Sequence, residues 1–148
     1  MNNTIVFYDP FGLMRTSCPS CGDHNSDVHE GANIACANIG GNPTCRNTIL
    51  QLLPGGITCM HNKCKEGLHI ECGSCSGCGT INSDGDIVLC SGSLLPQPNL
   101  CGPIEGTVAH ELSHLCGVGN DGTKDRASSE NRRKAKTIEL ACRDKNFR

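Results

Sequence analysis

Residues 102–117 read GPIEGTVAHELSHLCG, and this stretch has the features of one amphipathic helix between two glycines. Pro103 suits the start of a helix, where its missing N–H would have no partner, and Glu105 suits the positive end of the helix dipole. Gly117 is a natural terminator, because glycine readily adopts the left-handed conformation that ends many helices. The sequence therefore predicts a helix from about residue 103 to residue 116.

This helix carries the motif H-E-x-x-H at His110, Glu111 and His114. Residues four apart lie on one face of a helix, so both imidazoles can bind a single Zn²⁺. Glu111 lies at the edge of that face, where it can take a proton from a water that zinc makes acidic and pass it to the leaving amine. The competing interpretation is a pair of surface histidines on an ordinary amphipathic helix. The motif favours a catalytic zinc site.

The region around the motif, residues 84–142, resembles the zincin group of zinc metallopeptidases, most specifically at the five motif residues. The resemblance implies a strand before the active-site helix, whose edge pairs with an extended peptide substrate. Ile87–Cys90 follows an Asp-Gly turn and is rich in β-forming residues, so we expect it to be that strand.

A catalytic zinc usually has three protein ligands, so one is still needed. The spacing begins like the extended metzincin pattern, but Asn120 stands where that pattern has its last histidine, and Asp121 lies one residue further on. Gluzincins instead use a glutamate from the next helix, predicted here over residues 126–144. If that helix returns antiparallel, a residue near its start faces His114. We therefore favour Glu130 as the third ligand, ahead of Glu139 and Asp121.

An oxyanion-stabilising side chain, which zincins often have, is not singled out by the sequence. His61, His69 and Arg132 remain open candidates, whereas Tyr8 lies in an N-terminal segment far from the motif.

Cysteine makes up 13 of the 148 residues, and there are only four aromatic residues. Because aromatic side chains normally supply the largest buried areas, the core is thin and needs cross-links. We favour disulfides, which form in oxidising compartments. Two alternatives remain open: a structural zinc held by knuckle-like pairs such as Cys18 and Cys21, and a redox-active C-x-x-C unit.

The odd cysteine count leaves one thiol free, bridged to another chain or bound to metal. Cys116 and Cys142 lie on the two predicted C-terminal helices and form a plausible pair. A tight antiparallel hairpin would separate them, however, so this pairing conflicts with the choice of Glu130.

Charge and hydropathy exclude several classes of protein. No apolar run reaches the about 18 residues that a membrane span needs, and no secretory signal is readable. Residues 124–148 hold nine Lys or Arg against four Asp or Glu. We interpret this basic tail as a solvated helix face rather than as a nucleic-acid-binding segment.

Residues 1–13 read MNNTIVFYDPFGL, and their N-N…Y-D-P-x-G-L order resembles the end of the core of RHS/YD-repeat proteins. In that family the segment marks the junction with a variable C-terminal toxin domain. The resemblance implies a junction at residues 1–13 and a toxin module at residues 14–148. It also implies delivery outside the producing cell, after synthesis in the cytoplasm, and a possible immunity protein as partner.

These observations predict a small, cysteine-rich, zincin-like α+β domain, with loops and short strands over residues 14–80, then the active-site helix and a C-terminal helix. The predicted function is a zinc-dependent peptidase acting on a protein or peptide substrate, with Zn²⁺ bound by His110, His114 and Glu130 and with Glu111 as the general base. The alternative is a non-enzymatic, cysteine-rich zinc-binding or interaction module with a basic C-terminal helix.

Overall fold

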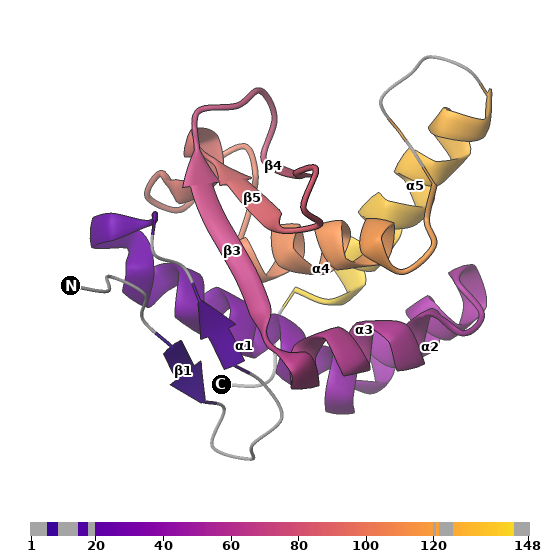
Figure 1. Cartoon of the computed structure of the whole chain (residues 1–148). Coiled ribbons are helices and arrows are strands. Elements are labelled where there is room, and N and C mark those ends of the chain that lie inside the picture. The colour runs from indigo at the N-terminus through magenta and orange to yellow at the C-terminus, as the bar shows by residue number, and fades with distance from the viewer. Residues whose placement is uncertain (1–5, 9–14, 18–19, 120, 122–125, 144–148) are drawn as a thin grey trace.

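The computed structural model describes residues 6–8, 15–17, 20–119, 121 and 126–143, and it has the predicted α+β architecture (Figure 1). Its elements follow the chain in the order β1 (Val6–Tyr8), β2 (Arg15–Ser17), η1 (Gly22–His24), α1 (Asn25–Gly41), α2 (Pro43–Leu52), α3 (Gly56–Glu66), β3 (Leu68–Gly73), β4 (Gly79–Ile81), β5 (Ile87–Cys90), η2 (Ser91–Leu94), α4 (Ile104–Leu115) and α5 (Arg126–Ala141).

The strands form one sheet in the order β1-β2-β3-β5-β4. β3 runs parallel to both β2 and β5, whereas β4 returns antiparallel to β5 through a turn closed by Gly85 N–H to Asn82 O. In β3, Leu68 and Ile70 are buried, whereas His69 and Glu71 are exposed. This alternation is typical of a sheet with helices on one face only. The predicted strand Ile87–Cys90 is confirmed as β5.

Three helices occupy residues 25–66, where loops and short strands were predicted, so that prediction is wrong. α1 is rich in Gly and Asn, which are poor helix formers, so its sequence did not indicate a helix. Tertiary contacts compensate: Val28, Ala32 and Ile39 are fully buried along one face. The gain from burying this apolar face outweighs the low intrinsic propensity.

The two predicted C-terminal helices are confirmed as α4 and α5, and they pack against each other. Their contacts run in opposite directions along the chain: Gly106 lies against Arg143, and Gly119 lies against Asn131. The helices are therefore antiparallel. The first turns of α5 project past the end of α4 (Figure 1).

Six disulfides cross-link the fold, which confirms the preference for disulfides over zinc knuckles at these twelve cysteines. They pair Cys21–Cys72, Cys36–Cys64, Cys45–Cys142, Cys59–Cys116, Cys75–Cys90 and Cys78–Cys101. No bridge joins the two cysteines of a C-x-x-C unit among them, so the structure offers no redox motif in its described part. The remaining cysteine, Cys18, lies outside the described residues.

The expected pair Cys116–Cys142 is wrong. Cys116 bonds to Cys59 on α3, and Cys142 bonds to Cys45 on α2. The antiparallel packing of α4 and α5 puts these two cysteines at opposite ends of the helix pair, as the conflict in the sequence suggested. Each helix end is instead fixed to the N-terminal helices.

The N-terminal segment 1–13 contributes only β1 to the described structure, paired antiparallel to β2. The rest of that segment, including the Asp-Pro turn, lies outside the described residues. None of the described helices combines the length and the apolarity that a membrane crossing requires.

Candidate metal centre

α4 brings the motif histidines to one side of the helix. The ring centroids of His110 and His114 are 5.1 Å apart. One ligand atom from each of His110, Glu111 and His114 lies within 4.8 Å of the others. Val108 and Leu112, on the opposite face, are fully buried and anchor the helix in the core. One face of α4 is thus structural, and the other presents metal-ligand side chains.

Both imidazole rings are held by their Nδ1 atoms. His110 Nδ1 lies 2.9 Å from Glu139 Oε1, and His114 Nδ1 lies 3.2 and 3.1 Å from the carbonyl oxygens of Val118 and Gly119. These partners are all hydrogen-bond acceptors, so they favour a proton on Nδ1 in each ring. A neutral imidazole protonated at Nδ1 presents its lone pair at Nε2, which is the state that a metal ligand requires.

Asp121 is the carboxylate that meets the two Nε2 atoms. Its Oδ2 lies 3.0 Å from His114 Nε2 and 3.7 Å from His110 Nε2. Two ligand atoms each about 2.0–2.1 Å from a tetrahedral zinc lie about 3.3 Å apart, and the observed separations bracket that value. Two imidazoles and one carboxylate are also a donor set that zinc accepts. His110 and His114, which together with Glu111 form a group that could hold a metal ion, thus have the Asp121 carboxylate beside them as a further donor.

The structure does not bring Glu130, the favoured third ligand, into this group. Its exposed carboxylate instead pairs with Arg133 on the same helix. The prediction placed the start of α5 opposite His114, but the first turns of α5 project past the end of α4. Asp121, the least favoured of the three candidates, is the carboxylate that lies beside both imidazoles.

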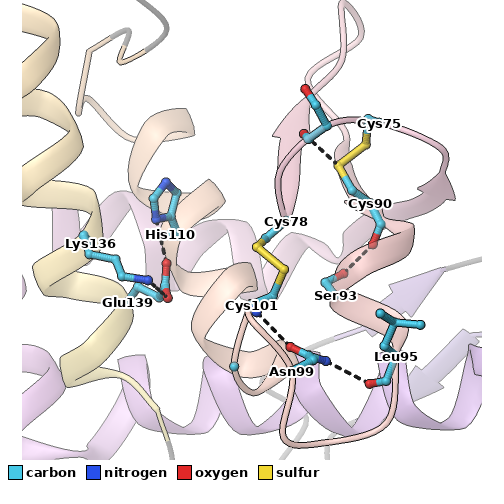
Figure 2. The surroundings of a disulfide bond; sticks show 12 residues. Cys75, Cys78, Cys90, Ser93, Leu95, Asn99, Cys101, His110, Lys136 and Glu139 are labelled. Carbon is cyan, nitrogen blue, oxygen red and sulfur yellow. Dashed lines mark hydrogen bonds and ion pairs between the residues drawn. A yellow bond between two sulfur atoms is a disulfide. The ribbon is translucent and has the colours of Figure 1, made fainter.

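Glu139 contacts His110 from the side away from the site, through Nδ1 rather than Nε2, so its place is that of an orienting group and not of a ligand (Figure 2). Its Oε2 accepts hydrogen bonds from Lys136 and Arg143. Burial alone would raise the pKa of Glu139, but the hydrogen bonds from His110 and Lys136 outweigh it and lower the pKa to about 2. The carboxylate therefore stays ionised.

The hydrogen bond between His110 and Glu139 also affects the pKa of His110. Burial opposes the charged imidazolium, but the hydrogen bond to Glu139 and the nearby carboxylates of Glu111 and Asp121 outweigh it, so the pKa of His110 is raised.

Glu111 is nearly buried, with 5% of its surface exposed, and its Oε1 lies 4.0 Å from His110 Nε2. Burial raises the pKa of its carboxyl above the usual range, although the two imidazoles act in the opposite direction. A carboxylate with a raised pKa holds a proton more readily than a free one, which suits a general base. Gly79 of β4 packs directly on it: a Cβ there would lie 3.3 Å from Glu111 Cγ.

A cleft of about 440 Å³ opens in front of these side chains. Its walls are formed by α4, the connection after it and strand β4, and its lining residues are Gly79, Thr80, Ile81, His110, Glu111, His114, Leu115, Val118, Gly119 and Asp121. β5, the strand whose edge was expected to pair with substrate, is flanked by β3 and β4 and has no open edge. In the described part of the chain, the sheet edge beside the cleft is that of β4, which follows β3 in the sequence but pairs with the far side of β5.

The oxyanion candidates lie in different places. His69 is exposed on β3, and His61 lines a separate cavity beside Arg46. Arg132 is the one joined to the site, because its Nη2 donates to the backbone oxygen of Asp121 at 2.8 Å.

The chain matches no protein-family model, and neither the curated proteins nor the solved structures gave a match. The site must therefore be interpreted from its own geometry.

Proposed function

We propose that the protein is a zinc-dependent peptidase, with His110, His114 and Asp121 as the zinc ligands and Glu111 as the general base. The observation that carries this proposal is the orientation of the two imidazoles. Hydrogen-bond acceptors hold both Nδ1 atoms, and both Nε2 atoms face the carboxylate of Asp121. An amphipathic helix with two chance histidines would not need acceptors on both rings.

When bound, zinc would supply Lewis acidity, which lowers the pKa of water and polarises a substrate carbonyl. The residues of the chain do the rest. Glu111 accepts a proton from the attacking water and passes it to the leaving nitrogen, as its burial and raised pKa favour. The edge of β4 lies beside the cleft, where its free backbone groups can bind an extended peptide.

Two disulfides hold the elements that form the cleft. Cys59–Cys116 fixes the end of α4 just beyond His114, and Cys78–Cys101 ties the segment before β4 to the loop that leads into α4. Both walls of the cleft are therefore cross-linked to the body of the fold. A site held in this way stays ordered despite the thin apolar core.

We further infer that this peptidase is a toxin or effector module of the RHS type. Two features support this setting: the resemblance of residues 1–13 to an RHS core junction, and six disulfides, which fit a protein that works in a secreted or extracellular space. A partner immunity protein that blocks the cleft would then protect the producing cell. The competing idea of a cysteine-held zinc module is weakened, because the twelve described cysteines are all bonded to one another.

The decisive experiment compares zinc content and hydrolysis of an unfolded protein substrate in three purified variants. Glu111→Gln should keep zinc and the fold but lose at least about 10²-fold in hydrolysis, because an amide cannot accept the proton. His110→Ala should lose both zinc and hydrolysis, because a ligand is removed. Glu130→Gln serves as the matched control, since this glutamate lies outside the site.

Active Glu111→Gln protein would refute the assignment of the base. Wild-type protein that binds one zinc without hydrolysing any peptide would refute the peptidase and leave the metal site standing.

A further inference from the structure

The carboxylate of Glu139 lies at the centre of a small charge cluster behind the metal centre. Only 7% of its side chain is exposed. Its two oxygens have separate partners: Oε1 meets His110 Nδ1 at 2.9 Å, and Oε2 meets Lys136 Nζ at 2.7 Å and Arg143 Nη2 at 2.8 Å (Figure 2 shows His110, Lys136 and Glu139). The carboxylate cannot rotate without losing one set of bonds.

The two cations that hold Oε2 differ in their surroundings. The side chain of Lys136 is 51% exposed, so water can replace its hydrogen bond. That of Arg143 is 22% exposed. Loss of the arginine would remove the less exposed of the two donors and leave Oε2, on a side chain that is 7% exposed, with Lys136 as the other donor among the described residues.

Arg143 is accommodated by two glycines, one in the loop before α4 and one in its first turn. A Cβ on Gly102 would lie 2.5 Å from Arg143 Nη2, and a Cβ on Gly106 would lie 3.1 Å from the Cγ and Nε atoms of Arg143 and from Glu139 Cγ. Gly102 also has a φ of +73°, a conformation that L side chains rarely adopt. The first turn of α4 and the loop before it thus leave room for this guanidinium.

The free-energy cost of this arrangement is high for an element with a purely structural role. The Nε atom of Arg143 is buried and has no hydrogen-bond partner among the described residues. Replacing both partners of a buried ion pair by apolar residues of similar volume is often neutral or stabilising, so stability alone does not require the pair. An ionised Glu139 does, however, give His110 Nδ1–H a permanent acceptor, which directs the Nε2 lone pair to the metal side.

We propose that Arg143 is a positioning residue of the metal centre: it fixes the carboxylate of Glu139, which in turn fixes the tautomer and ring orientation of the ligand His110. The inference rests on the proposed metal site. Hydrogen-bond partners of ligand histidines typically contribute 10–100-fold to metal affinity, and Arg143 acts one step further out, through such a partner.

The test is a zinc titration of the metal-free protein with a competing chelator. Arg143→Met removes the donor but keeps the length of the side chain, and it should weaken zinc binding about 10-fold, the lower end of the range for a direct partner. Arg143→Lys should restore part of the affinity. Lys136→Met, which removes the exposed donor to the same oxygen, should cost less than Arg143→Met. Arg133→Met serves as the control, because this arginine pairs with Glu130 away from the cluster.

A second readout does not need zinc or activity. At pH 9, ¹⁵N NMR of the metal-free protein should show the His110 proton on Nδ1 in the wild type and a mixture of tautomers in Arg143→Met. If Arg143→Met does not fold, Glu139→Gln tests the same link, since its amide can donate to Nδ1 and move the proton to Nε2.

Unchanged zinc affinity together with an unchanged His110 tautomer in Arg143→Met would overturn the inference, while the metal site itself would stand. A wild-type protein that binds no zinc would instead overturn the proposed function and, with it, the role of Arg143.

Discussion

Glu139→Gln should change how the stability of the protein depends on pH, and the size of the effect follows from the structure. Hydrogen bonds from His110 and Lys136 overcome the effect of burial and lower the pKa of Glu139 from 4.5 to about 2. A group whose folded-state pKa is depressed stabilises the fold above its unfolded pKa, and that contribution disappears as the pH falls through the folded pKa. The window therefore runs from about pH 5 down to pH 2.

A pKa difference of about 2.5 corresponds to about 3 kcal/mol, at about 1.4 kcal/mol for each pKa unit. At pH 5 nearly all of this contribution is present, and at pH 2 only about 0.4 kcal/mol remains. We expect the stability difference between wild type and Glu139→Gln to shrink by about 2–3 kcal/mol over this range. At pH 5 and below, His110 is largely protonated, so its own titration adds little.

The assay is guanidinium unfolding of both proteins, with disulfides intact and a chelator present, at several pH values between 5 and 2. Other carboxylates titrate equally in both proteins and cancel in the difference. The control is Glu130→Gln, whose exposed pair with Arg133 is screened by solvent and should change the pH dependence far less. A wild-type–variant difference that is the same at pH 5 and pH 2 would refute the reasoning.

Three further changes test the site. Asp121→Asn should weaken zinc binding at least 10-fold by isothermal titration, since a neutral amide replaces a charged ligand, and unchanged affinity would exclude Asp121 as a ligand. Gly79→Val should lower hydrolysis at least about 10-fold, because a Cβ there would meet Thr107, the backbone oxygen of Val88 and Glu111, so that β4 and the base must shift; full activity would show that β4 has no role in placing Glu111. Replacing Cys59 and Cys116 together by alanine should lower the free energy of unfolding by about 3–4 kcal/mol in a denaturant titration and should weaken zinc binding. An unchanged zinc affinity would show that this disulfide does not support the metal site.

The local features of the C-terminal half were predictable from the sequence alone. Pro103, Glu105 and Gly117 mark the bounds of α4 within one or two residues, and the Asp-Gly turn before Ile87–Cys90 marks β5. Each of these signals acts between residues close in the chain, so no knowledge of packing was needed. The pairing of His110 with His114 has the same origin, because a helix alone sets the spacing of residues four apart.

The helices over residues 25–66 could not be identified in this way. Their sequences are rich in Gly, Asn and Cys and have low intrinsic helix propensity, so burial and cross-links decide their conformation. The preference for disulfides followed from the thin core. Their pairing did not, because it depends on which helix ends meet in space.

The third ligand also depends on both the sequence and the tertiary structure. The sequence contained Asp121, Glu130 and Glu139 as candidates, but only the packing of the folded chain decides which carboxylate reaches the two Nε2 atoms. In the structure Asp121 lies at the imidazoles, Glu130 is exposed to solvent and Glu139 lies behind His110. The sequence by itself determined the chemistry available to this site, whereas the tertiary structure decided the role of each carboxylate, because a ligand is defined by where its oxygen lies and not by its position in the chain.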